Sequence, residues 1–187
     1  DVCSSDLKCV SLFFKMVKDI KIIEKLSNEV NLKSILDLGC GNGRLTNCLV
    51  KKGIRVTGID LENRSYNNNI NFIKSDIRDY KINQNYDLVI SSCVLHFMKK
   101  DEAINTINKM KKNTSKGGYN LLVCMSELEE SKMKHYRFYP SKKELINLYK
   151  DWKIENISQS YTDWQEHDGL PIHRHNIIVF LAKNKLN

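Results

Sequence analysis

The pattern of apolar and polar residues divides the chain into short apolar runs that alternate with amphipathic stretches. Short runs rich in Ile, Val and Leu are typical of buried strands, whereas apolar residues three or four positions apart indicate a helix facing a core. The apolar runs predict strands over residues 35–38, 55–59, 71–74, 86–91, 119–125, 153–162 and 175–183. The amphipathic stretches predict helices over residues 9–29, 44–52, 100–113 and 141–150. Strands that alternate with helices indicate an α/β fold with a mostly parallel sheet.

The end of the chain departs from this alternation, because no helical pattern separates the last two strands. These strands are therefore predicted to pair as an antiparallel hairpin, with Asp168-Gly169 in the connection. The helix before them begins with a capping box, in which Ser141 is the N-cap and Glu144 lies three residues later. The prediction is a seven-stranded sheet whose last strand is antiparallel.

The composition is that of a globular protein, with 41% hydrophobic and 28% charged residues in a chain of 187. We expect a single domain over residues 1–187, with an N-terminal helix within residues 1–30 and an α/β core over residues 33–184. The net charge of +8 does not by itself indicate a nucleic-acid partner, because Lys residues are spread over the predicted helices and form no single patch. Both a monomer and a dimer stay open as oligomeric states.

Cysteine usage and hydropathy point to a reducing, aqueous environment. The six cysteines include no C-x-x-C pair, which argues against a metal site. Cys40, Cys93 and Cys124 lie in apolar contexts where a reduced thiol acts as a small hydrophobe. No apolar run approaches the roughly 20 residues that a membrane span needs, and no segment has the layout of a signal peptide. We therefore expect a cytoplasmic protein without a membrane partner.

The most informative segment follows the first predicted strand and reads Gly39-Cys40-Gly41-Asn42-Gly43-Arg44. A strand, a glycine turn and a helix start together bring a nucleotide-like ligand against bare backbone. The dinucleotide fingerprint G-x-G-x-x-G would need a glycine at position 44, which is Arg44. The observed G-x-G-x-G spacing, with Asp37 two residues ahead, instead resembles the first motif of the class I S-adenosylmethionine (SAM) methyltransferases. A glycine-rich turn that binds no ligand is the alternative.

Polar side chains also follow the next strands, at the edge where ligands of parallel sheets bind. Asp60 can accept both ribose hydroxyls of an adenosine. Asp76 can accept from the adenine amino group, and Ile77 can pack on the ring. The small Ser91-Ser92 pair leaves room for the methionine part, and Asp37 lies near the expected place of the ligand's amino group. For any one of these acids alone, a helix N-cap or a solvated strand end is the alternative. The predicted cofactor-binding residues are Asp37, Gly39, Cys40, Gly41, Gly43, Arg44, Asp60, Leu61, Asp76, Ile77, Ser91 and Ser92.

Three later segments narrow the resemblance to one family. They are residues 86–98, Gly117-Gly118-Tyr119-Asn120, and His173-Arg174-His175 just before the last apolar run. With the glycine loop, these segments resemble the TehB-like tellurite-resistance methyltransferases over about residues 33–184. The resemblance implies the three-layer, Rossmann-like class I fold, SAM as cofactor, and methylation of tellurite, selenite or another small nucleophile. Asn67-Asn68-Asn69 departs from the family, which usually has a better helix at that point.

The predicted substrate side is rich in histidine. His173 and His175 should share one face of the last strand and Arg174 the other. These side chains could hold an oxyanion through charge-assisted hydrogen bonds, with solvated or capping roles as the alternative. His96 follows the fourth strand and faces the same end, with helix capping or packing as its alternative. The catalytic candidates are therefore His173, Arg174, His175 and His96.

Two further positions have mixed interpretations. Arg44 could pair with the cofactor carboxylate or the substrate, or could lie on the helix surface. The aromatic and basic residues 135–140 follow the fifth strand and could close over the pocket, although loop anchoring is the favoured role of Phe138.

Rival functions stay open beside a small-molecule methyltransferase of this family. One is a methyltransferase for an organic acceptor such as a quinone, thiol or carboxylate. Another is a SAM-binding domain without catalysis, against which the intact Asp60 and Asp76 and the His173-Arg174-His175 segment argue. A nucleic-acid methylase usually has an Asn-Pro-Pro-Tyr type motif after the fourth strand, where this chain has Ser91-Ser92-Cys93-Val94.

Overall fold

A computed structural model describes residues 17–50, 52–62, 69–130, 137–164, 166 and 171–185 of the chain. The strands are β1 (Ser34–Leu38), β2 (Arg55–Asp60), β3 (Asn71–Lys74), β4 (Tyr86–Ser92), β5 (Thr114–Met125), β6 (Lys153–Tyr161) and β7 (Asn176–Lys183). The helices are α2 (Val17–Glu29), α3 (Asn47–Val50), α4 (Lys100–Lys112) and α5 (Lys142–Leu148), with the short 3-10 helix η2 (Leu95–Phe97).

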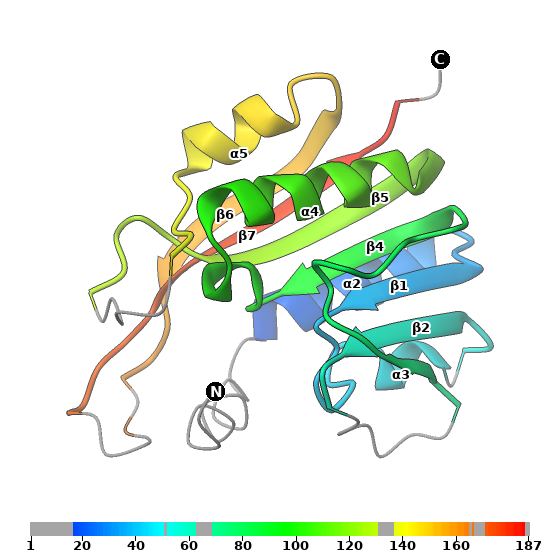
Figure 1. Cartoon of the computed structure of the whole chain (residues 1–187), viewed down its shortest axis with the longest axis horizontal. Coiled ribbons are helices and arrows are strands. Elements are labelled where there is room, and N and C mark those ends of the chain that lie inside the picture. The colour runs from blue at the N-terminus through cyan, green and yellow to red at the C-terminus, as the bar shows by residue number, and fades with distance from the viewer. Residues whose placement is uncertain are drawn as a thin grey trace.

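The strands form one seven-stranded sheet in the order β3-β2-β1-β4-β5-β7-β6 (Figure 1). The pairs among β1 to β5 are parallel, whereas β7 runs antiparallel to both of its neighbours, β5 and β6. The predicted fold class is therefore confirmed, including the antiparallel last strand. Because β6 runs in the same direction as β1 to β5, the end of β6 and the start of β7 lie at the carboxyl edge of the sheet.

Helices cover both faces of the sheet and make three layers. Figure 1 shows α4 and α5 in front of the sheet and α2 behind it. The core on the α2 and α3 face contains Ile23, Leu49 and alternate strand residues such as Ile35. The core on the α4 and α5 face contains Ile107, Leu145 and the intervening strand residues. Burial on both faces explains why the central strands are nearly continuous apolar runs in the sequence.

Two element boundaries differ from the predicted ones. The α-helical part after the glycine loop is only α3, because the N–H groups of Thr46, Leu49 and Lys52 bond to carbonyls three residues back, as in 3-10 turns. The fifth strand starts at Thr114 instead of Tyr119, so Gly117 and Gly118 lie within it and not before it. A Cβ on Gly118 would lie 2.9 Å from the carbonyl oxygen of Asp87, so glycine permits the close approach of β5 to β4 at this register shift.

Other expectations fall wholly or partly outside the described residues. These are the first half of the predicted helix 9–29, the polar segment 63–68 and the Asp168-Gly169 connection. The N-cap of α5 is confirmed, since the Ser141 hydroxyl accepts the Glu144 N–H at 3.0 Å. Within the described residues, no helix combines the length and apolar character needed to cross a membrane.

Candidate active site

The glycine loop joins β1 to α3 at the carboxyl edge of the sheet. Gly39, Gly41 and Gly43 have φ angles of 78°, 52° and 75°, in the left-handed region that glycine adopts without strain. The carbonyl of Ile59 in β2 accepts the N–H groups of Gly39 and Cys40 at 2.8 and 3.1 Å, which ties the loop to the sheet. A Cβ on Gly39 would lie 2.8 Å from the Val94 side chain, so this turn has no room for a larger residue.

Asp60 supports the same loop from the end of β2. Its Oδ2 atom accepts the Gly41 N–H at 2.9 Å, and its Oδ1 atom accepts the Glu62 N–H at 3.3 Å. An ionised carboxylate has about four lone-pair sites, so further donors can still bind. Leu61, the next residue, is 53% exposed and offers an apolar surface beside this carboxylate.

Asp37 is a buried acid beneath the loop. Burial raises the pKa of its carboxyl to about 7, with Arg44 lowering it and the charge of Asp60 raising it further. Its strand neighbours Leu36 and Leu38 belong to the α4 face, so alternation places Asp37 on the α2 face. A buried carboxyl next to one guanidinium is a site where a second cationic group would be favoured.

The end of β4 carries two buried hydroxyl groups. Within the described part of the chain, neither the Ser91 nor the Ser92 Oγ atom has a hydrogen-bond partner. Buried polar atoms are nearly always satisfied, so such a pair at a strand end calls for a ligand or ordered water. Ser92 shares the α2 face with Asp37, because it continues the alternation of Leu88 and Ile90.

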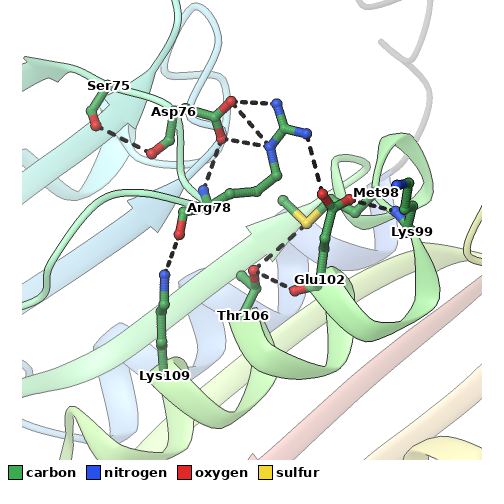
Figure 2. Close-up of polar contacts among 8 residues, drawn as sticks. All are labelled: Ser75, Asp76, Arg78, Met98, Lys99, Glu102, Thr106 and Lys109. Atoms are coloured by element: carbon green, nitrogen blue, oxygen red, sulfur yellow. Dashed lines mark hydrogen bonds and ion pairs between the residues drawn. The ribbon is translucent and has the colours of Figure 1, made fainter.

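Asp76 is held by a neighbouring arginine (Figure 2). Its Oδ1 accepts the backbone N–H and the Nε of Arg78 at 2.8 and 3.0 Å, and Arg78 also pairs with Glu102 of α4 at 3.5 Å. These hydrogen bonds from Arg78 hold the pKa of Asp76 below its usual value. Glu102 accepts the Lys99 N–H at 2.8 Å, and Lys109 donates to the Arg78 carbonyl, so α4 braces the segment after β3. An adenine amino group would share the Asp76 carboxylate with Arg78.

Ile77 is buried at 7% exposure in the core on the α4 face, together with Leu38 and Ile59. This position suits core packing, so the exposed Leu61 is the better placed of the two for contact with a ring. Cys40 is also buried, and a Cβ on Gly58 would lie 2.8 Å from its sulfur. Glycine at position 58 thus makes room for the Cys40 thiol under the loop.

At the opposite end of the carboxyl edge, His173 and His175 meet. The centres of their rings lie 4.9 Å apart, the angle between the ring planes is 81°, and both side chains are buried. His175 Nδ1 lies 3.0 Å from Oε1 of Glu129, which follows β5, while the other Glu129 oxygen accepts the Asn176 N–H at 2.8 Å. The two histidine rings are therefore brought together, and one of them, His175, faces a buried carboxylate.

Arg174 points into a different environment. Its guanidinium carbon lies 3.9 Å from the ring centre of Tyr161 and 5.0 Å from that of Trp164. It also pairs with Glu130 at 3.4 Å, and its buried Nε has no hydrogen-bond partner within the described residues. Cation–π contacts fix the guanidinium against the two aromatic rings, so that some of its N–H donors stay available to bind an anion.

The remaining candidates lie on other elements. His96 is buried in η2, with its ring 4.3 Å from that of Phe97 and its carbonyl accepting the Arg137 N–H at 2.7 Å. Phe138 is buried in the core on the α4 face, in line with its favoured role as an anchor. His135 and Tyr136 lie outside the described residues.

The sequence did not point to several residues that contribute to this edge. Glu129 stands in an acidic run, Glu127-Leu128-Glu129-Glu130, where nothing marks one carboxylate as buried. Arg78 lies two residues after Asp76, and that spacing was the one local signal for their contact. Tyr161 and Trp164 are far from the chemistry-bearing motifs, and only folding brings Arg174 against them.

The chain resembles known proteins in both sequence and fold. The sequence model described as "Tellurite resistance protein TehB" matches residues 16–169, well over half of the chain. The chain belongs to the TehB family. A probable SAM-dependent methyltransferase TehB of Haemophilus influenzae is 30% identical over 145 residues, which are 72% of this chain and 51% of that protein. The predicted family membership is thus confirmed.

A solved structure of the TehB family has the same fold, and a further curated methyltransferase is similar in sequence. The crystal structure of TehB from Haemophilus influenzae has a TM-score of 0.76 and 26% identity, and the match covers 88% of this chain and 62% of that one. A ubiquinone biosynthesis O-methyltransferase of Rickettsia canadensis is 30% identical over 120 residues, or 49% of this chain and 51% of that protein. The chain spans about half the length of the curated relatives it matches.

Proposed function

We propose that this TehB-family chain binds SAM and transfers its methyl group to a small molecule. The observation that carries the proposal is the convergence of three features at one edge of the sheet: the left-handed glycine loop, the buried Asp37, and the hydroxyls of Ser91 and Ser92, which have no hydrogen-bond partner among the described residues. A nucleoside ligand with a cationic amino acid part matches each of these features. The relatives' names support the same cofactor.

Each part of the cofactor has a residue that suits it. The ammonium group of the methionine part suits Asp37, because burial disfavours its negative charge and a nearby cation would stabilise that charge. The methionine part also offers donors and acceptors to the Ser92 hydroxyl, which shares the α2 face with Asp37. Asp60 has lone pairs left for ribose hydroxyls, and Leu61 offers its exposed side chain to the base. When bound, SAM supplies an electrophilic methyl group on a sulfonium.

For the acceptor, we propose tellurite, selenite or a related chalcogen oxyanion. Arg174 supports an anionic acceptor, because two aromatic rings fix its guanidinium and its Nε donor has no hydrogen-bond partner among the described residues. His173 and His175 flank Arg174 in the chain, and their rings form a second group of hydrogen-bonding candidates apart from its guanidinium. His96 is kept as a further candidate from η2. Positioning such an anion in line with the methyl group would supply much of the acceleration.

A small organic acceptor is the second candidate. It is favoured by the aromatic surface around Arg174, where Trp164 is 62% and Tyr161 40% exposed. A quinol, thiol or carboxylate with a planar apolar part could stack there while Arg174 binds its polar end. The similarity to the ubiquinone biosynthesis O-methyltransferase supports this class.

Two measurements test the proposal. Titration calorimetry should give saturable binding of SAM and of its demethylated product S-adenosylhomocysteine, and folded protein that binds neither would overturn the cofactor assignment. A screen of SAM consumption over tellurite, selenite, thiols and quinols then identifies the acceptor.

The role of Arg174 is tested in the same screen with a matched pair of variants. Arg174→Ala should lose turnover of the preferred anionic acceptor, whereas Arg55→Ala, an exposed arginine at the amino end of β2, should retain it. Equal turnover in Arg174→Ala and wild type would remove this residue from the acceptor site.

A further inference from the structure

Glu129 is a buried carboxylate that faces a histidine and a backbone amide. Its side chain is fully buried, and that of His175 is 5% exposed. Oε1 lies 3.0 Å from His175 Nδ1, and Oε2 accepts the Asn176 N–H at 2.8 Å. Burying a charged group costs free energy unless the group is paired. A carboxylate at this place therefore needs hydrogen-bond donors or a cation that stabilise its negative charge.

The hydrogen bonds assign the same tautomer to both histidines. A carboxylate that already accepts a backbone N–H acts as an acceptor, so His175 donates from Nδ1 to Glu129. His173 Nδ1 lies 2.8 Å from the Pro171 carbonyl oxygen, which can only accept. In the neutral form, each ring therefore carries its proton on Nδ1 and its lone pair on Nε2.

Further contacts fix the frame around this pair. The Asn176 side-chain oxygen accepts from Ser126 at 2.5 Å and from Gln159 at 2.8 Å, which joins the end of β5 to β6 and β7. The backbone of His175 exchanges hydrogen bonds with Thr162, at 2.8 Å to the Thr162 N–H and 3.0 Å to its hydroxyl. His175 is thus fixed by the hydrogen bond to its imidazole ring and by the hydrogen bonds to its own backbone.

The pair lies on the same side of the sheet as the proposed cofactor site. Ile177 belongs to the α2 face, so alternation places His175 on that face, with Asp37 and Ser92. Ser92 pairs with Val123 of β5, and Met125 of β5 pairs with Ile177 of β7. His175 therefore lies two strands from Ser92 and just beyond the carboxyl edge, where an acceptor would approach.

We propose that Glu129 is a positioning residue that holds His175 in the Nδ1–H form, so that His175 Nε2 accepts a proton from the methyl acceptor. This rests on the proposed methyltransferase function and deepens it: the acceptor is a nucleophile that carries a removable proton, such as a thiol, a hydroxyl or a protonated oxyanion. The bond from the methyl carbon to the acceptor forms while the carbon–sulfur bond of the donor breaks. The bonding pair stays on sulfur, and the acceptor's proton passes to Nε2, giving an imidazolium that the Glu129 carboxylate stabilises.

The first test is a double-mutant cycle on turnover with the acceptor found by the screen. His175→Ala should lower kcat roughly 100-fold or more, as expected for loss of a general base. Glu129→Gln should lower kcat with little change in the Kd for SAM, and should have no further effect in the His175→Ala background. Glu127→Gln, an exposed carboxylate of the same loop, should behave as wild type. Glu129→Gln with wild-type turnover, or with the same loss when His175 is absent, would overturn the proposal.

A second measurement does not depend on turnover or on a tolerated substitution. Nitrogen-15 shifts of His175 in wild-type protein should show a protonated Nδ1 and an unprotonated Nε2 at pH 8. The opposite tautomer would overturn the role of Glu129.

A rescue experiment gives a third measurement. Free imidazole should partly restore turnover to His175→Ala. Wild-type protein that fails to bind SAM would instead refute the proposed function, while the tautomer would still decide the role of Glu129.

Discussion

The carboxyl group of Asp37 links the proposed cofactor site to the stability of the fold. Burial raises its pKa from 3.8 to about 7, because the charged form loses its hydration. Between these two values the folded protein holds a proton that the unfolded chain releases. The free energy of unfolding should therefore fall as the pH rises from about 4 to about 7, and stay at the lower level above pH 7.

Asp37→Asn should remove this penalty. At about 1.4 kcal/mol per pKa unit, the variant should gain up to about 4 kcal/mol of unfolding free energy over wild type at pH 8, and little at pH 4. The same variant should bind SAM more weakly, because it lacks the charge that suits the ammonium group. Urea denaturation at both pH values and calorimetry with SAM check the two effects. A stability difference that is the same at pH 4 and pH 8 would contradict the assignment.

At the scale of elements, the turn between β1 and α3 depends on glycine for two separate reasons, and the chain provides a control for one of them. Gly39 and Gly53 have φ angles of 78° and 76°, so alanine is strained at both. At position 39 the new Cβ would lie 2.8 Å from the Val94 side chain, whereas at position 53 no atom of the described residues lies within 4 Å. Comparing the two sites separates backbone strain from steric conflict.

Gly53→Ala should cost about 1–2 kcal/mol of unfolding free energy, the usual cost of a left-handed alanine. Gly39→Ala should cost more and should also weaken SAM binding, because Val94 or the loop must move. The double variant Gly39→Ala/Val94→Ala should recover part of the affinity for SAM. Chemical denaturation and calorimetry of the three proteins measure these effects, and equal stability losses at positions 39 and 53 would count against the steric explanation.

At the scale of the whole molecule, the continuous sheet joins the cofactor edge to a distant part of the fold. Both core layers extend from β1 to β7. At the β6 end of the sheet, the ring centres of Trp152 and Tyr149 lie 5.3 Å apart. We therefore expect one cooperative unfolding transition across the described residues. A ligand that binds the folded state should stabilise all of them together.

The Trp164→Phe variant leaves Trp152 as the lone tryptophan reporter, since the chain has 2 tryptophans. SAM at 100 times its Kd should raise the unfolding free energy by about 2.7 kcal/mol. It should raise Tm by about 2–4 °C for each kcal/mol. Trp152 fluorescence and far-UV circular dichroism should report the same shifted midpoint. If SAM raised the midpoint seen by dichroism but left the midpoint seen by Trp152 fluorescence unchanged, the two halves of the sheet would unfold separately.

Much of this architecture could be predicted because it is encoded locally. Burial on both faces makes β1 and β4 continuous apolar runs, and the glycine spacing in residues 39–43 marks a loop with unusual backbone angles. The missing helix before β7 predicted its antiparallel direction. The predicted boundaries were wrong where a long-range contact decides them. The fifth strand starts at Thr114 instead of Tyr119, because Gly118 can approach Asp87 of β4 closely.

The sequence by itself determined the fold class, the family resemblance and the positions of the acids at the strand ends, because each depends on neighbours within a few residues. Only the tertiary structure decided which of those groups share a site. It buried Asp37 and joined Glu129 to His175 across 46 positions of the chain. Asp37 is buried because β1 lies inside the sheet, and Glu129 meets His175 only when β5 and β7 pair, so no local pattern of residues records either outcome.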